Sequence, residues 1–164
     1  MILSTVRPTD DEITSTVQKY SDVLFRLCFS ILCNYADAED AVSDTIVKYI
    51  KKAPPFNDED HKKAWLIKTA SNVCKDKRRF NIRHNYVNLD DISEYQQEDS
   101  NNDVLMCLLR LPDKYKYVIH LFYIEGYKTE EIAKILEISS SAVRKRLQYG
   151  RKLLKSEYER NESL

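Results

Sequence analysis

The sequence predicts an all-α protein with two small helical domains joined by a flexible acidic linker. The 164 residues include only two glycines and four prolines, and 32% are charged, a composition typical of helical proteins. Apolar residues recur at steps of three and four, the period of an amphipathic helix. This period stops at 84–103, where Asn, Asp, Glu and Gln dominate. We therefore expect domains at 1–83 and 104–164 with a linker at 84–103.

Three helices are expected in the N-terminal domain. The first spans 13–32, the second begins with Asp37 as its N-cap and ends before Pro54, and the third spans 61–80 and becomes basic at its C-terminal end. The residues expected to face inward are Val17, Tyr20, Leu24, Leu27, Cys28 and Ile31, then Ala41, Val42, Thr45, Ile46, Tyr49 and Ile50, then Trp65, Leu66, Ala70, Val73 and Cys74.

The C-terminal domain should hold shorter helices with tight turns. The expected helix ends and caps are Leu111-Pro112 at a helix end, Asp113 as an N-cap, Gly126 as a helix stop, Thr129 as an N-cap, a turn at 137–139 and Ser139 or Ser140 as the last N-cap. The residues expected to face inward are Val118, Ile119, Leu121, Phe122 and Ile124, then Ile132, Ala133, Ile135 and Leu136, then Val143, Leu147, Leu153 and Leu154.

The segment "KTEEIAKILEISSSAVRKRLQYGRKLLK" has the pattern of a helix-turn-helix. A short helix, a tight turn and a cationic second helix follow one another, and small serines open the second helix. Such an end fits closely into a DNA major groove, where Arg144 and Lys145 reach base edges or phosphates and Arg146, Arg151 and Lys152 reach flanking phosphates. The alternative is an ordinary solvated amphipathic helix.

Composition argues against several other classes of protein. No apolar run is long enough to cross a bilayer, and "MILSTVRPTDDE" lacks the pattern of a secretion signal, so we expect a cytoplasmic protein. The four cysteines form no C-x-x-C pair and the three histidines are scattered, so we expect reduced structural thiols, no metal and no cofactor. The chain shows no catalytic set and no glycine-rich phosphate loop, so we expect no enzyme.

Two blocks of the chain resemble bacterial RNA polymerase sigma factors. The sequence "LRLPDKYKYVIHLFYIEGYKTEEIAKILEISSSAVRKRLQYGRKLLK" resembles their region 4, and "YADAEDAVSDTIVKYIKK" with "KKAWLIKTASNVCKDKRR" resembles their region 2. The matches cover 15–80 and 105–155 in the order of the family. With no room for other regions, the chain resembles the short extracytoplasmic-function (ECF) group. The resemblance implies a promoter-specificity subunit that binds core RNA polymerase, recognises the −35 and −10 promoter elements and assists promoter melting.

The resemblance also implies three sets of site residues. Those matching the segment that docks on the polymerase β′ clamp helices are Asp37, Glu39, Asp40, Asp44 and Lys48. Those matching the −10-binding segment are Phe56 for base stacking, Asn72 for a base edge, and Lys75, Lys77, Arg78 and Arg79 for phosphates. Those matching the −35-binding helix are Ser140, Ser141, Arg144, Lys145, Arg146, Gln148 and Arg151.

Each set has a structural alternative. In these alternatives the acidic residues only begin a solvated helix, Phe56 anchors its own loop, and the cluster at 75–79 suits any helix C-terminus. Ser43 and Ile46 also stand where the family usually has Gln and Phe, and Lys145 where it usually has Ser.

The partners that the resemblance implies are core RNA polymerase (the β′ clamp helices and the β flap), promoter DNA and an anti-sigma factor that could hold the chain at a membrane. A stand-alone helix-turn-helix regulator is the alternative function. It needs only the C-terminal block and binds duplex operators without polymerase.

Overall fold

The computed structural model of the chain describes residues 7–83 and 102–163. Within those ranges the elements of regular structure are helices, which confirms the predicted all-α class. The chain divides into two compact units, residues 1–87 and 88–164. The predicted linker at 84–103 lies almost entirely outside the described residues.

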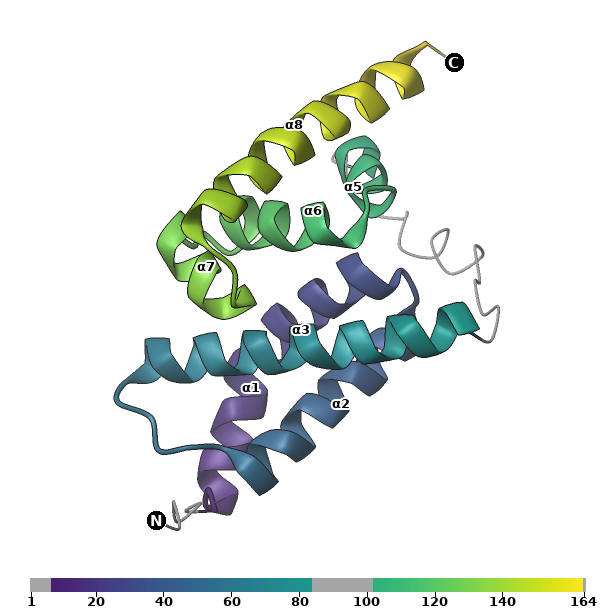
Figure 1. Cartoon of the computed structure of the whole chain (residues 1–164). Coiled ribbons are helices and arrows are strands. Elements are labelled where there is room, and N and C mark those ends of the chain that lie inside the picture. Colours follow the sequence, from purple (N-terminus) through teal and green to yellow (C-terminus); the bar gives the residue numbers. More distant parts are fainter. Residues whose placement is uncertain (1–6, 84–101, 164) are drawn as a thin grey trace. The chain divides into compact units, whose positions relative to one another are not determined.

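The N-terminal unit is built from α1 (Asp10–Leu32), α2 (Tyr35–Lys52) and α3 (Glu59–Arg83), and each helix packs against the other two (Figure 1). Their predicted apolar faces meet in a common core that buries Leu24, Ile31 and Leu66 completely. Fully burying a side chain of this size contributes about 1.5–3 kcal/mol. Val17 was expected in this core but is 36% exposed, because it lies at the edge of the α1 face.

The helix caps in this unit differ from those expected. Thr9 and Glu12 form a capping box that starts α1, in which the Glu12 carboxylate accepts from the Thr9 N–H at 2.7 Å. Asn34, and not Asp37, is the N-cap of α2, since its Oδ1 accepts from the Asp37 N–H at 2.7 Å. The junction explains the error. Cys33 ends α1 in the left-handed conformation (φ 54°), so a single residue remains before α2 begins.

A hydrogen-bonded carboxylate joins α1 to the start of α3. Glu59 accepts from the Tyr20 hydroxyl at 2.6 Å and from the Lys19 ammonium at 3.1 Å. The bond from Tyr20, followed by that from Lys19, lowers the pKa of Glu59 below its usual value. A depressed carboxyl pKa stabilises the fold above the unfolded value of 4.5, and this contribution is lost as pH falls through the folded value.

We therefore expect Tyr20→Phe to lower the free energy of unfolding of this unit by about 1 kcal/mol near neutral pH. The deficit relative to wild type should narrow as pH falls from 4.5 through the lowered pKa of Glu59 in the folded wild type, because the ionised carboxylate that accepts from Tyr20 is lost there. Trp65 is the only tryptophan, so its fluorescence during urea unfolding reports on this unit. Tyr35→Phe, at a ring that is 49% exposed, is the matched control and should leave the midpoint unchanged.

The C-terminal unit holds α5 (Asn102–Leu109), α6 (Asp113–Ile119), a π-helical turn η2 (His120–Ile124), α7 (Thr129–Leu136) and α8 (Ser140–Glu162). The long helix α8 packs against α5, α6 and α7 (Figure 1). Val118, Leu121, Ile132, Val143 and Leu147 form the centre of the core, as their spacing predicted.

The turn η2 changes the register of the helix that begins with α6. A π-helical turn has more residues per turn than an α-helix, so positions after it rotate relative to those before it. Ile124 is consequently 47% exposed, although α-helical spacing from Leu121 predicted that it would face inward. Gly126 ends this segment with φ 74°, as expected for a helix-stopping glycine.

Three other details of this unit differ from expectation. Pro112 occupies the N-cap of α6, where Asp113 was expected, and Lys128 occupies that of α7, where Thr129 was expected. The Glu131 carboxylate accepts from the Lys128 N–H at 2.7 Å, so this backbone donor at the start of α7 is hydrogen-bonded without a threonine cap. Leu153 was expected to face inward but is 38% exposed, whereas its neighbour Leu154 is half-buried and lines a cavity with Cys107 and Leu108 of α5.

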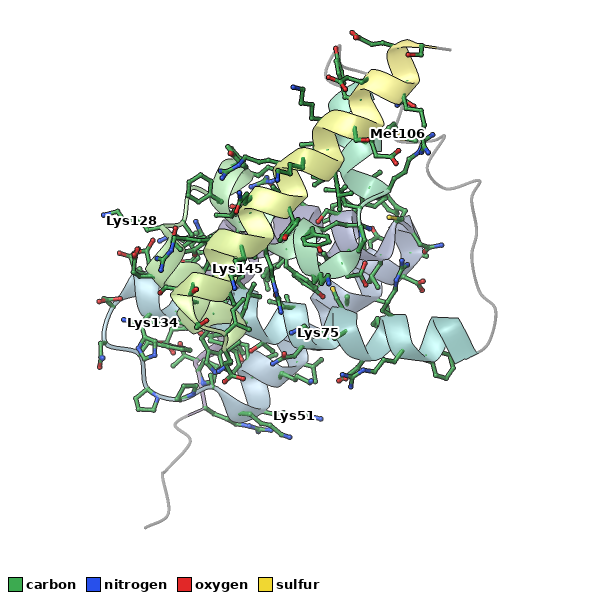
Figure 2. The ribbon with its side chains drawn as sticks, turned by 45° about the horizontal axis from the view of Figure 1, so that its top comes forward. Lys51, Lys75, Met106, Lys128, Lys134 and Lys145 are labelled. Atoms are coloured by element: carbon green, nitrogen blue, oxygen red, sulfur yellow. The ribbon has the colours of Figure 1, made fainter. Side chains whose placement is uncertain are left out.

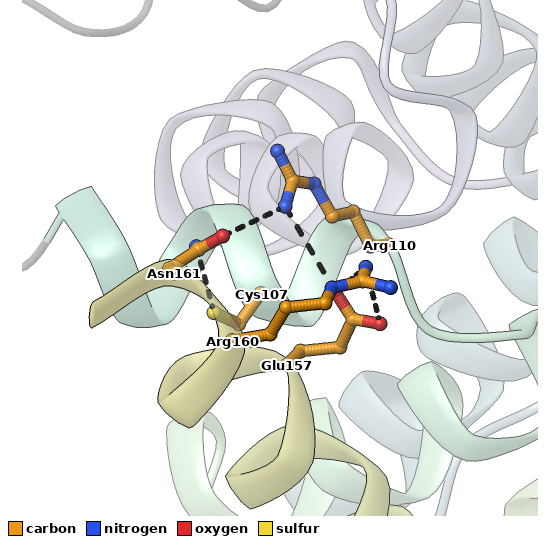
Figure 3. Close-up of polar contacts among 5 residues, drawn as sticks. All are labelled: Cys107, Arg110, Glu157, Arg160 and Asn161. Atoms are coloured by element: carbon orange, nitrogen blue, oxygen red, sulfur yellow. Dashed lines mark hydrogen bonds and ion pairs between the residues drawn. The ribbon is translucent and has the colours of Figure 1, made fainter. Parts of the chain in front are cut away.

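A polar cluster ties α5 to the C-terminal end of α8 (Figure 3). The Arg110 guanidinium donates to the Asn161 Oδ1 at 3.0 Å and lies 3.9 Å from the Glu157 carboxylate. The Asn161 amide donates to the Cys107 thiol sulfur at 3.4 Å, and Arg160 pairs with Glu157 at 2.7 Å. These contacts hold the last turns of α8 against α5, which sequence periodicity did not reveal.

Candidate functional site

The helix-turn-helix predicted from the sequence is present in α7, the turn and α8. Glu137 ends α7 in the left-handed conformation (φ 57°), and the Ile138 N–H donates to the Ala133 carbonyl at 3.0 Å. Ser139 then caps α8, with its hydroxyl oxygen accepting from the Ala142 N–H at 3.1 Å. The turn therefore places the serine-rich start of α8 at the surface of the unit.

One exposed ridge of α8 is polar and cationic. Ser141, Lys145, Gln148 and Lys152 follow one another at steps of four, three and four, so they share a face, and all four are exposed. Figure 2 labels Lys145 on the N-terminal half of this helix. The opposite face carries the buried Val143, Leu147 and Gly150.

The remaining predicted residues of α8 flank this ridge. Arg144 and Arg151 are exposed and seven residues apart, so they line one edge, and Arg146 is half-buried on the other. Ser140 is half-buried at the first turn. The structure thus brings Ser141, Arg144, Lys145, Gln148 and Arg151 onto one side of α8, whereas Ser140 and Arg146 are half-buried at its margins.

Arg151 has a second environment that the sequence did not predict. Its guanidinium donates to the Tyr123 hydroxyl at 3.1 Å. It also lines an apolar cavity of about 510 Å³ between α5, η2 and α8, together with Lys155 and apolar side chains. The apolar members of this lining are Cys107, Leu108, Ile119, Tyr123, Ile124, Leu154 and Tyr158. The exposure of Tyr123 and Ile124 makes this cavity open to a partner.

A second polar face lies on α3. Asn72, Lys75 and Arg79 follow at steps of three and four and therefore share one face, while the neighbouring Ser71 and Val73 are buried. Figure 2 labels Lys75 on this helix. Arg79 is 75% exposed and only loosely paired with Asp76 at 3.9 Å. Arg78 is half-buried beside this face.

Lys77, by contrast, points away from this face of α3. It contacts the Asp40 carboxylate and lies 3.2 Å from the Asp44 carboxylate, both on α2. Burial lowers the pKa of Lys77, but the hydrogen bonds to Asp40 and Asp44 outweigh it and hold the pKa above its usual value. The structure therefore joins residues from two predicted sets, one for polymerase and one for DNA.

The acidic residues of α2 lie outside the core of the unit. Ala38, Ala41, Thr45 and Tyr49 form the buried face of the helix. Glu39, Asp40 and Asp44 are exposed, and Asp37 and Lys48 are half-buried. The set predicted for polymerase docking is thus accessible on one helix. Ser43, which is not part of that set, is exposed on the same helix next to Asp44.

Phe56 lies in the connection between α2 and α3, inside an aromatic cluster. Its ring stacks on Tyr49 with centroids 6.4 Å apart and meets the edges of His61 and Trp65 at 5.4 and 5.8 Å. The ring also lines a cavity of about 540 Å³, whose wall includes Arg7 and Lys62. Phe56 is therefore an anchor of its loop as well as part of a pocket wall.

The described parts of the chain hold no group of three or more potential metal ligands. All four cysteines lie in those parts as thiols, and Cys33 is the only one of them that is not buried. None of the described helices is long and apolar enough to span a membrane.

Family models match both units. Sigma-70 region 2 matches residues 16–84, and sigma-70 region 4 matches residues 101–154. These matches coincide with the α1–α3 unit and with α5 to the middle of α8.

Several curated proteins are similar over most of their length. The ECF RNA polymerase sigma factor SigW of Bacillus subtilis is 27% identical over 90% of this chain and 89% of its own length. SigV of the same organism is 25% identical, over 87% and 89%. The ECF sigma factor SigL of Mycobacterium tuberculosis is 27% identical, over 84% and 83%.

Solved structures share the fold. The sigma factor RpoE of Bartonella quintana, solved with the anti-sigma factor NepR, covers 91% of this chain with a TM-score of 0.74 and 19% identity, and the match spans 98% of that structure. CnrH, solved with the cytosolic domain of CnrY, covers 90% of this chain and 88% of its own, with a TM-score of 0.61 and 22% identity. With both family regions present in order and ECF relatives matched along most of the chain, this protein belongs to the sigma-70 family as an ECF-type sigma factor.

Proposed function

We propose that this chain is the promoter-specificity subunit of RNA polymerase, which binds the core enzyme, recognises −35 and −10 elements and assists promoter melting. The observation that carries the proposal is that regions 2 and 4 of sigma-70 match two separate compact units. Each unit presents a polar, cationic helix face at its surface, on α3 in the first, where Asn72 and Arg79 are exposed and Lys75 and Arg78 half-buried, and on α8 in the second.

The ridge of α8 is proposed to contact the −35 element as duplex DNA. Ser141 and Gln148 are short or neutral polar groups that approach base edges closely, while Lys145 lies between them. Arg144 and Arg151, along the edge of the ridge, are placed for flanking phosphates, which position the helix without reading sequence. Ser140 and Arg146 complete the proposed −35 set at its margins.

The polar face of α3 and the Phe56 loop are proposed to bind the −10 element. Asn72 offers an amide to a base edge, and Lys75, Arg78 and Arg79 offer cations to the phosphates of a melted strand. The cavity beside Phe56, at about 540 Å³, has room for a base turned out of the stack, with Arg7 and Lys62 in its wall.

The acidic surface of α2 is proposed to dock on the β′ clamp helices of the polymerase. Carboxylates at Glu39, Asp40 and Asp44 suit a basic partner and steer its approach. Asp37 and Lys48 lie at the margins of the same surface. In the C-terminal unit, the apolar cavity lined by Ile124 and Tyr158 suits an apolar segment of the β flap.

We also propose a cognate anti-sigma partner, because both structural neighbours were solved with a partner of this kind or a cytosolic domain bound to them. The proposed subunit acts in the cytoplasm with the core polymerase and has no catalytic activity of its own. The catalytic chemistry belongs to the core enzyme.

Binding of duplex DNA by the isolated chain separates this function from that of a stand-alone regulator. We expect weak binding whose affinity falls with salt by a log–log slope of about −0.9 for each phosphate contacted. The measurement is fluorescence anisotropy of a labelled duplex at several salt concentrations, without polymerase. Tight binding to one duplex sequence by the chain alone would favour the stand-alone regulator instead.

A further inference from the structure

We infer that Lys77 is a positioning residue for the polymerase-docking face of α2, and that it does not contact DNA. This inference rests on the proposed function, because it assigns Asp40 and Asp44 to polymerase docking. Lys77 was predicted to bind DNA phosphates together with Lys75, Arg78 and Arg79, because it lies among them in the sequence. The inference assigns Lys77 a different role from these three residues.

The helical period explains why Lys77 leaves the DNA-facing side of α3. Lys77 lies four residues after Val73 and seven after Ala70, and both of those residues are buried in the core. The Lys77 side chain therefore leaves α3 along its core-facing side, where α2 crosses. Its own side chain is only 22% exposed, against 75% for Arg79.

The carboxylates on α2 need the cation that Lys77 supplies. Asp40 and Asp44 are four residues apart on one helix, a spacing at which like charges repel and destabilise the helix. The Lys77 ammonium contacts both, so it removes this repulsion and holds the two carboxylates in one arrangement. The hydrogen bonds that the Lys77 ammonium donates to both carboxylates keep the pKa of Lys77 raised despite its burial, so the bridge persists throughout the neutral range.

The two carboxylates stay accessible while they are bridged. The Asp40 side chain is 63% exposed and that of Asp44 is 50% exposed, whereas Lys77 lies beneath them. A carboxylate has lone pairs for more than one donor, so each can accept from Lys77 and from a basic partner together. Lys77 thus presents a prearranged pair of acceptors outward, which reduces the ordering cost of docking.

Affinity for the core enzyme is the first readout. Labelled full-length chain is titrated with core RNA polymerase of the source organism, in the absence of DNA. Lys77→Met keeps the apolar stem without the charge and should weaken binding about threefold to tenfold, because the carboxylates are no longer prearranged. Lys77→Arg keeps the charge and both contacts and should stay within about twofold of wild type.

The salt dependence of promoter binding by the holoenzyme is the second readout. A purely structural role of Lys77 would not predict the difference between the variants described next. Arg79→Met should reduce the log–log slope by about 0.7–0.9, the value for one lost phosphate contact. Lys77→Met should leave this slope unchanged. A reduced slope for Lys77→Met, or unchanged or tighter core binding, would overturn the inference.

Two further variants distinguish a failure of the Lys77 inference from a failure of the proposed docking surface. Lys77→Gln, which keeps a hydrogen-bond donor, serves as a second neutral variant if Lys77→Met lowers the unfolding midpoint followed by Trp65 fluorescence, and should also weaken core binding. The double variant Asp40→Asn with Asp44→Asn tests the docking surface itself. If it leaves core affinity unchanged, the proposed docking on α2 is wrong. If it weakens binding but both neutral variants of Lys77 do not, the docking stands and the role of Lys77 is wrong.

Discussion

Asn72→Ala should lose about tenfold to a hundredfold in promoter opening while changing initial promoter binding much less, the range expected for one lost contact to a base edge. Asn72 is exposed on α3 between two buried neighbours, so its amide points outward without supporting the core. Alanine is also a better helix former than asparagine, so the loss cannot come from a weaker helix. Permanganate reactivity of thymines in the melted −10 region measures the opening, and footprinting of the closed complex measures the binding.

Asp22→Ala is the matched control for this prediction. Asp22 is exposed on α1, a helix that carries none of the residues assigned to DNA or polymerase. It should leave both permanganate reactivity and footprint unchanged. Unchanged permanganate reactivity in Asn72→Ala itself would contradict the role assigned to Asn72 in holding the −10 strand.

Gly150→Leu should destabilise the C-terminal unit by about 1–3 kcal/mol, the usual effect of overpacking a tight contact. A Cβ at Gly150 would lie 3.1 Å from Ile119 Cγ1, 3.2 Å from its Cδ1 and 3.4 Å from Tyr115 Cβ. Helices α6 and α8 approach so closely there that even the first atom of a side chain is crowded. The result should appear as a lower midpoint by circular dichroism, with an unchanged transition by Trp65 fluorescence, which reports on the other unit.

Two related variants control this prediction. In Gly150→Ala, a gain of about 1 kcal/mol in helix propensity opposes the close contact with Ile119. Adding Ile119→Val removes Cδ1, so the double variant should be more stable than the sum of the two single changes. Additive effects of the two changes, or no loss of stability in Gly150→Leu, would show that the close approach at Gly150 does not limit packing.

Most of the fold follows from local patterns in the sequence. The faces that carry Leu24, Leu66 and Val143 were identified from their spacing, because amphipathic helices in a small domain bury one stripe each. The errors occurred at caps and register, as at Asn34 and Ile124. A cap depends on the length of the junction, and the π-helical turn has no signal that the periodicity of apolar residues reveals.

The glycine in the middle of α8 is a further feature that the sequence alone does not explain. Sequence alone marks Gly150 as unfavourable by about 1 kcal/mol, with no reason for its presence. The reason is the contact with Ile119, which lies more than thirty residues earlier in the chain. Long-range packing of this kind is set by the tertiary structure, so the sequence could not supply it.

The candidate sites were predictable as helix faces but not as contacts. The exposed ridge containing Ser141, Lys145 and Gln148 follows directly from helical spacing. The environment of Lys77 does not, because its partners Asp40 and Asp44 lie on another helix. Phe56 is similar, since its position against Tyr49 depends on how the loop folds back on α2.

Association with core RNA polymerase, followed by run-off transcription, tests the central claim most directly. The purified full-length chain is mixed with core enzyme of the source organism, passed through gel filtration and supplied with fragmented genomic DNA of that organism. The sigma-factor account predicts a stoichiometric complex and new transcription start sites that the core enzyme alone does not produce. A chain that elutes apart from the core enzyme and yields no new start sites would contradict it.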